Sequence, residues 1–125
     1  MNYLGLDYGL AHIGIALAET SLATPLPPVH NNEHLLSRLK DLVKEYSVAK
    51  IVCGVPEGRL VPVIENFAKE LESFTGVEVV LHPETLSTQE ALQKLKESGA
   101  SRAKRQNDHS YAACLILEDY LEFQK

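Results

Sequence analysis

The chain of 125 residues contains no tryptophan, one methionine and two cysteines, and aromatic residues make up only 6% of it. It has no apolar run near the ~18 residues that a membrane-spanning helix requires, so we expect no transmembrane segment. The chain does not open on a basic region followed by a long apolar core, so we expect no secretory signal. Cys53 and Cys114 lie inside apolar runs without metal-knot spacing, which predicts buried free thiols in a cytoplasmic protein.

Positive charge is also scarce. Lysine and arginine number 12 against 17 aspartates and glutamates, for a net charge of −5. Such a chain is not a generally basic nucleic-acid binder, so a nucleic-acid partner would need a local basic patch or a bridging cation. The aromatic residues do not alternate with basic ones, so base stacking is not indicated. The length and the 45% hydrophobic content predict a single globular domain over residues 1–125.

The most informative stretch is residues 2–18, NYLGLDYGLAHIGIALA. Two apolar runs flank a polar bend, which predicts a strand, a tight turn and a second strand running back. Asp7 therefore stands where a central strand ends, and burying a carboxylate there is costly unless it is paired or bound to a cation. The alternative is a hairpin with an Asx-type turn at Asp7. Gly9 suits either a tight turn or the close approach of a phosphate or a metal-bound water.

Strand and helix patterns then alternate along the chain. Residues 24–30 include three prolines, which lack the N–H of a strand ladder, so we expect an edge strand or an extended loop. We expect Asn31 or Asn32 to cap the next helix, and Gly76 to end the one after it. Apolar spacing predicts helices at 35–46, 62–75, 87–98 and 108–120, and strands at 49–55 and 77–81. The expected inward-facing residues are Val63, Ile64, Phe67, Ala68, Leu71 and Phe74 in the second helix, and Tyr111, Ala112, Leu115, Ile116 and Tyr120 in the last.

This order predicts an α/β fold, a mixed sheet with helices on both faces in which the strands at 3–6, 49–55 and 77–81 are parallel. Ligands bind at the carboxyl ends of such strands. Asp7 and Glu84 each follow one of them, and Asp108 and His109 begin the last helix, which can reach the same edge if it crosses the sheet. Oxygen and imidazole ligands suit Mg²⁺ or Mn²⁺. Two such ions activate water and stabilise the leaving oxygen in phosphodiester hydrolysis.

The motifs LGLDYG…IGIALAE, IVCGVP, HPETLSTQEAL and DHSYAACLILEDYL resemble the bacterial YqgF/RuvX family of Holliday-junction resolvases and pre-16S rRNA nucleases. The resemblance runs from Asn2 to about Leu121. It implies an RNase H-like fold with a five-stranded mixed sheet, and divalent-metal-dependent nuclease activity. It also implies a carboxylate at the end of the first strand, which is Asp7, and a second acid in a D-E-R-x-T-T-like motif, where Glu84 matches.

The chain departs from the family pattern at two positions of this site. Within PETLST, Pro83 stands at an acid position and Thr85 at the arginine position. Counting back from the Leu-Ile-Leu run at 115–117, the family's third acid falls on His109, with Asp108 one residue earlier. A neutral histidine can ligate a divalent ion, and the helix N-terminus disfavours its protonated form. Either His109 or Asp108 is therefore the expected third ligand.

Each candidate also has a simpler interpretation. Glu84 could be a surface acid, Asp108 or Asn107 a helix cap, and His109 a solvated first-turn residue. His12 and His82 are expected to be structural or surface residues. The basic residues Arg102, Lys104 and Arg105 fit phosphate contacts, or a solvated loop.

Three functions compete on the sequence alone. The first is a nuclease that processes the 5′ end of pre-16S rRNA or resolves Holliday junctions. The second is a non-catalytic RNase H-like module that binds nucleic acid through a degenerate metal site. The third is a member of the actin-like sugar-kinase and ATPase superfamily, which the single domain and the absence of a P-loop disfavour. A resolvase should be a two-fold dimer and an rRNA nuclease need not be, so monomer and homodimer both stay open.

Overall fold

The computed structural model describes residues 1–56, 58–84 and 108–124, except for the side chains of Asp108 and His109. Its elements are β1 (Asn2–Asp7), β2 (His12–Ala18), β3 (Ala23–His30), α1 (Leu35–Glu45), β4 (Val48–Val55), α2 (Val61–Thr75), β5 (Glu78–Pro83) and α5 (Asp108–Phe123). The helix predicted at 87–98 lies outside the described residues. In the described part of the chain, no helix is both long and apolar enough to cross a membrane.

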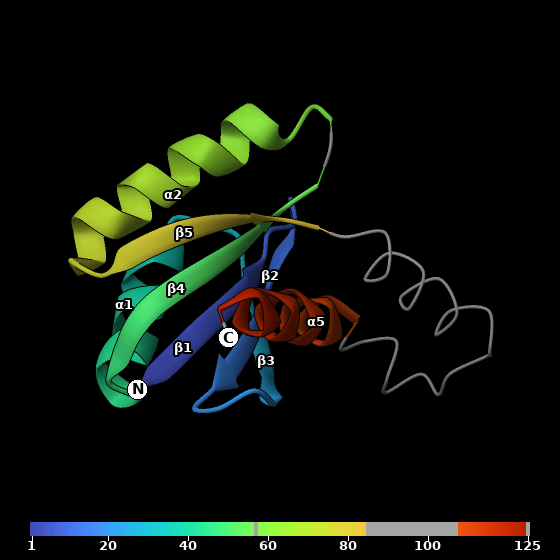
Figure 1. Cartoon of the computed structure of the whole chain (residues 1–125). Coiled ribbons are helices and arrows are strands. Elements are labelled where there is room, and N and C mark those ends of the chain that lie inside the picture. Colours follow the sequence, from blue (N-terminus) through green and yellow to red (C-terminus); the bar gives the residue numbers. More distant parts are fainter. Residues whose placement is uncertain (57, 85–107, 125) are drawn as a thin grey trace.

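The strands form one mixed sheet in the order β3-β2-β1-β4-β5 (Figure 1). The first three strands pair antiparallel, while β1, β4 and β5 run parallel, as predicted. β1 is central because its residues are apolar on both faces. β3 carries its three prolines at one end of the strand order, where the missing N–H groups cost least.

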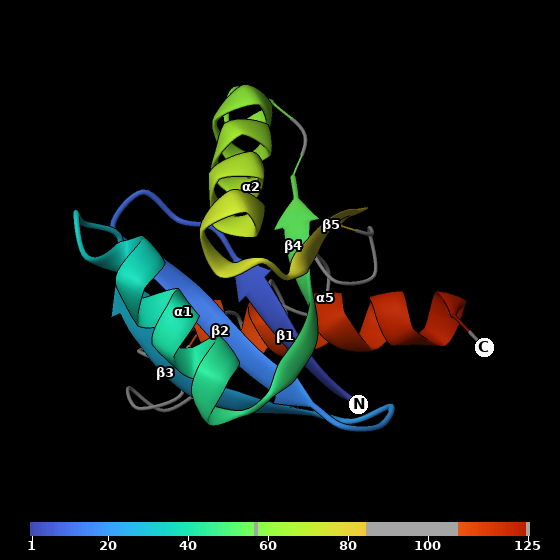
Figure 2. The same ribbon diagram turned by 90° about the vertical axis from the view of Figure 1, so that its left-hand side faces the viewer.

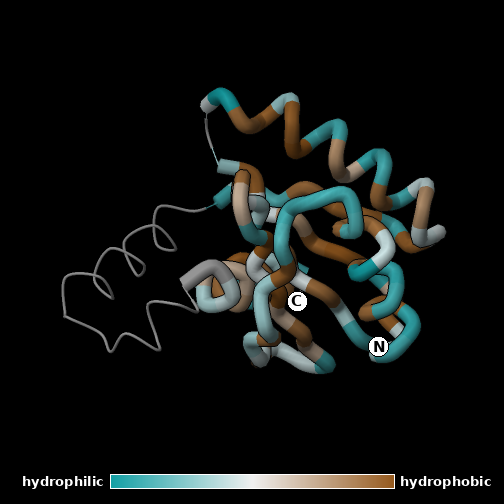
Figure 3. Tube along the Cα trace, turned by 180° about the vertical axis from the view of Figure 1, so that it is seen from behind, coloured by the Kyte–Doolittle hydropathy of each residue, from teal (hydrophilic) through white to brown (hydrophobic). Residues whose placement is uncertain are grey.

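Helices cover both faces of the sheet, which confirms the predicted layers. α1 and α2 lie on one face and α5 crosses the other (Figure 2). Strand alternation sorts the side chains between two cores, so that Leu4 and Leu6 face α1 and α2. Ala16, Ala18 and Val52 face α5. Figure 3 shows the apolar strands at the centre of the molecule and alternating hydropathy along α2.

Two glycines let α5 lie directly on the sheet. A Cβ atom on Gly5 of β1 would stand 2.8 Å from Leu117 Cβ and 3.0 Å from the carbonyl oxygen of Ala113. A Cβ on Gly54 of β4 would overlap Ile116 Cδ1. At both positions a Cβ atom would come closer to α5 than packed atoms tolerate. The absence of a side chain at each glycine therefore provides the room that the helix occupies.

The expected helix start was wrong in detail. α1 begins after His34, and no side chain among the described residues caps it. Asn32 Oδ1 instead accepts a hydrogen bond from the His34 N–H at 2.9 Å, two residues before the N-cap position at His34. Asn31 Nδ2 donates to the Gly9 carbonyl at 2.9 Å and ties the loop to the β1–β2 turn. Gly76 ends α2 with φ of +75°, as predicted.

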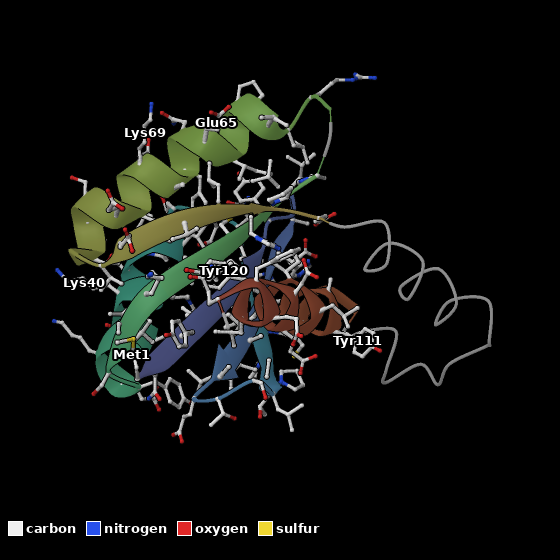
Figure 4. All side chains as sticks on the ribbon, viewed as in Figure 1. Met1, Lys40, Glu65, Lys69, Tyr111 and Tyr120 are labelled. Atoms are coloured by element: carbon white, nitrogen blue, oxygen red, sulfur yellow. The ribbon has the colours of Figure 1, made fainter. Side chains whose placement is uncertain are left out.

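The predicted buried faces were wrong at their borders. Val63 and Phe74 of α2 are 43% and 42% exposed, and Tyr111 of α5 is 40% exposed and points away from the sheet (Figure 4). In α5 the buried face includes Ala113 and Leu117, which were not predicted, while the buried face of α2 is narrower than predicted and consists of Ile64, Phe67, Ala68 and Leu71. The helical period identifies the direction of a buried face but not its width.

We expect Gly5→Ala to destabilise the protein by about 1–3 kcal/mol, since its new methyl meets backbone and Cβ atoms that cannot rotate away. Gly54→Ala should cost less, because it meets the end of the Ile116 side chain. Ile116→Val should then recover part of the Gly54→Ala loss and none of the Gly5→Ala loss, in a double-mutant cycle measured by urea unfolding. Additive losses in the Gly54–Ile116 pair would contradict this contact.

Candidate active site

The carboxyl ends of β1 and β5 bring two acids together. Asp7 is the last residue of β1, opposite Gly54 of β4 and Gly14 of β2. Glu84 directly follows β5, and its backbone N–H donates to the Val55 carbonyl at 3.1 Å, which extends the β4–β5 pairing by one residue. Strand alternation from Gly5 places Asp7 on the sheet face that α5 covers. The predicted convergence of Asp7 and Glu84 is confirmed.

The two carboxyl groups are hydrogen-bonded to each other and partly desolvated. Burial, the charge of Asp7 and the hydrogen bond with Asp7 together raise the pKa of Glu84 to about 7. Two carboxyl groups in such contact oppose each other's ionisation, which favours a proton shared between them when no cation is bound. Its partly buried position and its contact with Asp7 distinguish Glu84 from an ordinary surface acid.

Cys53 lies behind the acids and does not add a ligand. It pairs with Leu6 in the sheet and packs in the core under α1 and α2. Burial, Asp7 and Glu84 raise the pKa of its thiol to about 12, so it stays protonated at neutral pH. Cys53 and Cys114 are both buried free thiols, as predicted.

The first turn of α5 is the expected source of the third ligand. Asp108 and His109 are the first residues of this helix, but their side chains lie outside the described part, as do Arg102, Lys104 and Arg105. Within the residues that the structure describes, no group of three or more His, Cys, Asp or Glu side chains gathers. The roles of these five residues therefore stay predictions.

Polar side chains hold α5 in place, and among them the sequence interpretation named only His82, as a structural or surface residue, and Tyr120, as an inward-facing residue. The imidazole of His82, which is buried as a structural residue, contacts Asp119 Oδ2 at 2.7 Å through Nε2 and packs edge-on against Tyr120. Lys50 Nζ bridges Tyr120 Oη at 3.4 Å and Glu78 Oε1 at 3.3 Å. Ser110, which is fully buried, binds β2 and β3. The strand pattern could have predicted burial only for His82, because it stands two residues after Val80 and so lies on the same inward-facing side of β5.

The donor set of this edge fits a hard divalent cation. The described donors are carboxylate oxygens, which Mg²⁺ and Mn²⁺ prefer, and the neighbouring thiol is kept neutral. The charge of Asp7 raises the pKa of Glu84, because two negative charges at this edge repel each other. A bound cation would neutralise that charge. Asp7 and Glu84 are thus the two residues of the described chain that would hold such an ion.

Comparison with known proteins gives one consistent result. The family model described as "RuvX: Holliday junction resolvase" matches residues 1–123. A "Putative pre-16S rRNA nuclease" of Anaeromyxobacter sp. (strain Fw109-5) is 40% identical, over 98% of this chain and 97% of its own length. A protein of the same name from Bacillus subtilis (strain 168) is 37% identical, over 98% of each chain.

Solved structures share the fold. RuvC of T. thermophilus in complex with a Holliday junction substrate superposes with a TM-score of 0.67 at 14% identity, covering 99% of this chain and 96% of that one. The fowlpox virus Holliday junction resolvase gives a TM-score of 0.59 at 14% identity, covering 100% of both chains. The similarity confirms the predicted RNase H-like architecture.

The raised pKa of Glu84 predicts a pH-dependent stability in metal-free protein. The group titrates near 4.5 when unfolded and near 7 when folded, so the folded state binds its proton more tightly in between. This contribution is fully present below about pH 4.5 and is lost as the pH rises through 7. With allowance for partial solvent exposure, we expect a loss of about 1–2 kcal/mol from pH 5 to pH 8.

Urea unfolding in EDTA at a series of pH values measures this loss. Glu84→Gln should remove that part of the pH slope, while Glu65→Gln on the exposed face of α2 should leave it unchanged (Figure 4). An identical slope in wild type and Glu84→Gln would show that the two carboxyl groups do not share a proton.

Proposed function

The chain belongs to the RuvX family of Holliday junction resolvases, and we propose that it is a divalent-metal-dependent nuclease that hydrolyses phosphodiester bonds in structured nucleic acid. The observation that carries this proposal is the desolvated pair of Asp7 and Glu84 at the carboxyl edge of the sheet. The charge of Asp7 and the hydrogen bond with Asp7 both raise the pKa of Glu84. Two acids in such contact form a site that gains stability when a bound cation takes the place of the proton.

Each residue has a distinct task in this proposal. Asp7 and Glu84 would provide the oxygens that hold Mg²⁺ or Mn²⁺, and Glu84 would be a ligand in its deprotonated form. The ion supplies charge neutralisation at the phosphate and activation of water. Asp108 or His109 completes the ligand set from the first turn of α5. Arg102, Lys104 and Arg105 contact substrate phosphates and position the strand to be cut.

The names of the relatives suggest two substrates, pre-16S rRNA and the Holliday junction. We propose pre-16S rRNA as the substrate, because the relatives that match nearly the full length are named as putative pre-16S rRNA nucleases. The buried free thiols of Cys53 and Cys114 support a cytoplasmic location.

Removing either charge of the pair should abolish cleavage. We expect Asp7→Asn and Glu84→Gln to lower the rate at least 100-fold with Mn²⁺ or Mg²⁺, on labelled pre-16S rRNA fragments and on four-way junction DNA. Both variants should stay folded, because each substitution relieves repulsion in the metal-free protein. Asp41→Asn, an exposed acid on α1, is the matched control and should keep full activity. Cleavage that survives in Asp7→Asn would refute the proposal.

The third ligand can be identified by two substitutions. If it is His109, then His109→Asp should favour Mg²⁺ and move the loss of metal affinity to lower pH, because a carboxylate protonates below ~6.5. Asp108→Ala should then cost about 1 kcal/mol as a lost helix cap and leave activity intact.

The reverse pattern, in which Asp108→Ala is inactive and His109→Ala is active, would assign the ligand to Asp108. Isothermal titration with Mn²⁺ measures affinity independently of cleavage. If wild type shows no Mn²⁺ binding that depends on Asp7, the chain is a non-catalytic nucleic-acid-binding module instead.

A further inference from the structure

A bulge in the sheet lies directly beside Asp7. Along β2 and β3 the pairing passes from Ile13↔Val29 to Ile15↔Leu26, so Gly14 alone stands opposite both Pro27 and Pro28. Gly14 is also the residue that pairs with Asp7 on the other side. The two prolines have no N–H to donate, so the hydrogen-bond ladder between β2 and β3 is incomplete beside the Asp7–Gly14 pair.

Ser110 of α5 completes this ladder with its side chain. Its hydroxyl accepts a hydrogen bond from the Ile15 N–H at 3.3 Å and donates one to the Leu26 carbonyl at 2.6 Å. Ile15 and Leu26 are the paired residues next to the bulge, and Ser110 has no exposed surface. A helix side chain thus replaces a strand-to-strand bond, and both backbone groups would be left unsatisfied without it.

We propose that Ser110 is the positioning residue that sets the first turn of α5 relative to Asp7. The inference rests on the proposed function, in which Asp108 or His109 of that turn is the third ligand. Ser110 follows His109 directly, and its two hydrogen bonds fix the helix to the strand pair one step from the Asp7–Gly14 row. A shift of this turn by a fraction of an ångström would misplace the third ligand relative to Asp7, at the end of β1, and Glu84, directly after β5.

The chain offers a matched control for a purely structural anchor. Glu118 Oε2 accepts a hydrogen bond from the Ala23 N–H at 2.9 Å and ties the same helix to the same strand. Ala23 is the first residue of β3 and pairs with Ala18, at the end of the sheet away from Asp7. Glu118 therefore shares the anchoring role of Ser110 but not its place beside the acids.

The experiment compares Ser110→Ala, Ser110→Thr and Glu118→Ala with wild type in three measurements. Amide hydrogen exchange at Ile15 reports the bridge itself, titration with Mn²⁺ reports the ligand geometry, and kcat and KM are measured separately. Ser110→Ala should lose protection at Ile15 and about 10- to 100-fold in Mn²⁺ affinity, and kcat should fall with little change in KM. Ser110→Thr, which keeps the hydroxyl, should recover most of the affinity. Glu118→Ala should lower stability only.

Each outcome bears on the inference. Wild-type Mn²⁺ affinity in a folded Ser110→Ala protein would overturn it while leaving the nuclease proposal intact. An equal loss of affinity in Glu118→Ala would reduce Ser110 to one anchor among several. If wild type itself binds no Mn²⁺ through Asp7, the proposed function fails and this inference fails with it. Should Ser110→Ala not fold, Ser110→Cys takes its place, since a thiol has similar volume and bonds weakly.

Discussion

Direct contact between α5 and the backbone of the central strands is the constraint on which the site depends. The missing side chains of Gly5 and Gly54 allow Leu117 and Ile116 to reach the sheet. The helix then crosses from β3 to β5 and covers the face onto which Asp7 projects. Burial is the largest cause of the raised pKa of Glu84 at this edge of the sheet. A larger residue at either glycine would push the helix away from the strands that carry the two acids.

The pair of Asp7 and Glu84 lowers the stability of the metal-free fold while it provides the proposed metal ligands. Two acids that compete for a proton oppose folding, and the apolar core and the anchors of α5 must offset that cost. The polar pairs at the other end of the helix, such as His82 with Asp119, lie outside this conflict and stabilise the fold without taking part in the repulsion. Binding of a cation would remove the repulsion, so folding and metal binding favour each other.

Most of the architecture could be predicted from the sequence because strand ends carry a local signal. The apolar runs and prolines indicated the strands, and Asp7 and Glu84 were found because each follows such a run. The borders of the helical faces at Val63 and Tyr111 could not be found, because the width of a buried face depends on the neighbour that covers it. The anchors could not be found either. Ser110 bonds a residue 84 positions away and His82 one 37 positions away, and nothing local to a serine indicates such a partner.

The proline content of β3 has a consequence for association between molecules. β3 is the last strand on its side of the described sheet, and Pro25, Pro27 and Pro28 offer no N–H groups along it. An added strand from another chain would find too few donors to form a ladder there. This side of the molecule is therefore protected from edge-to-edge aggregation and from β-augmentation. A partner that docks on it must do so through side chains.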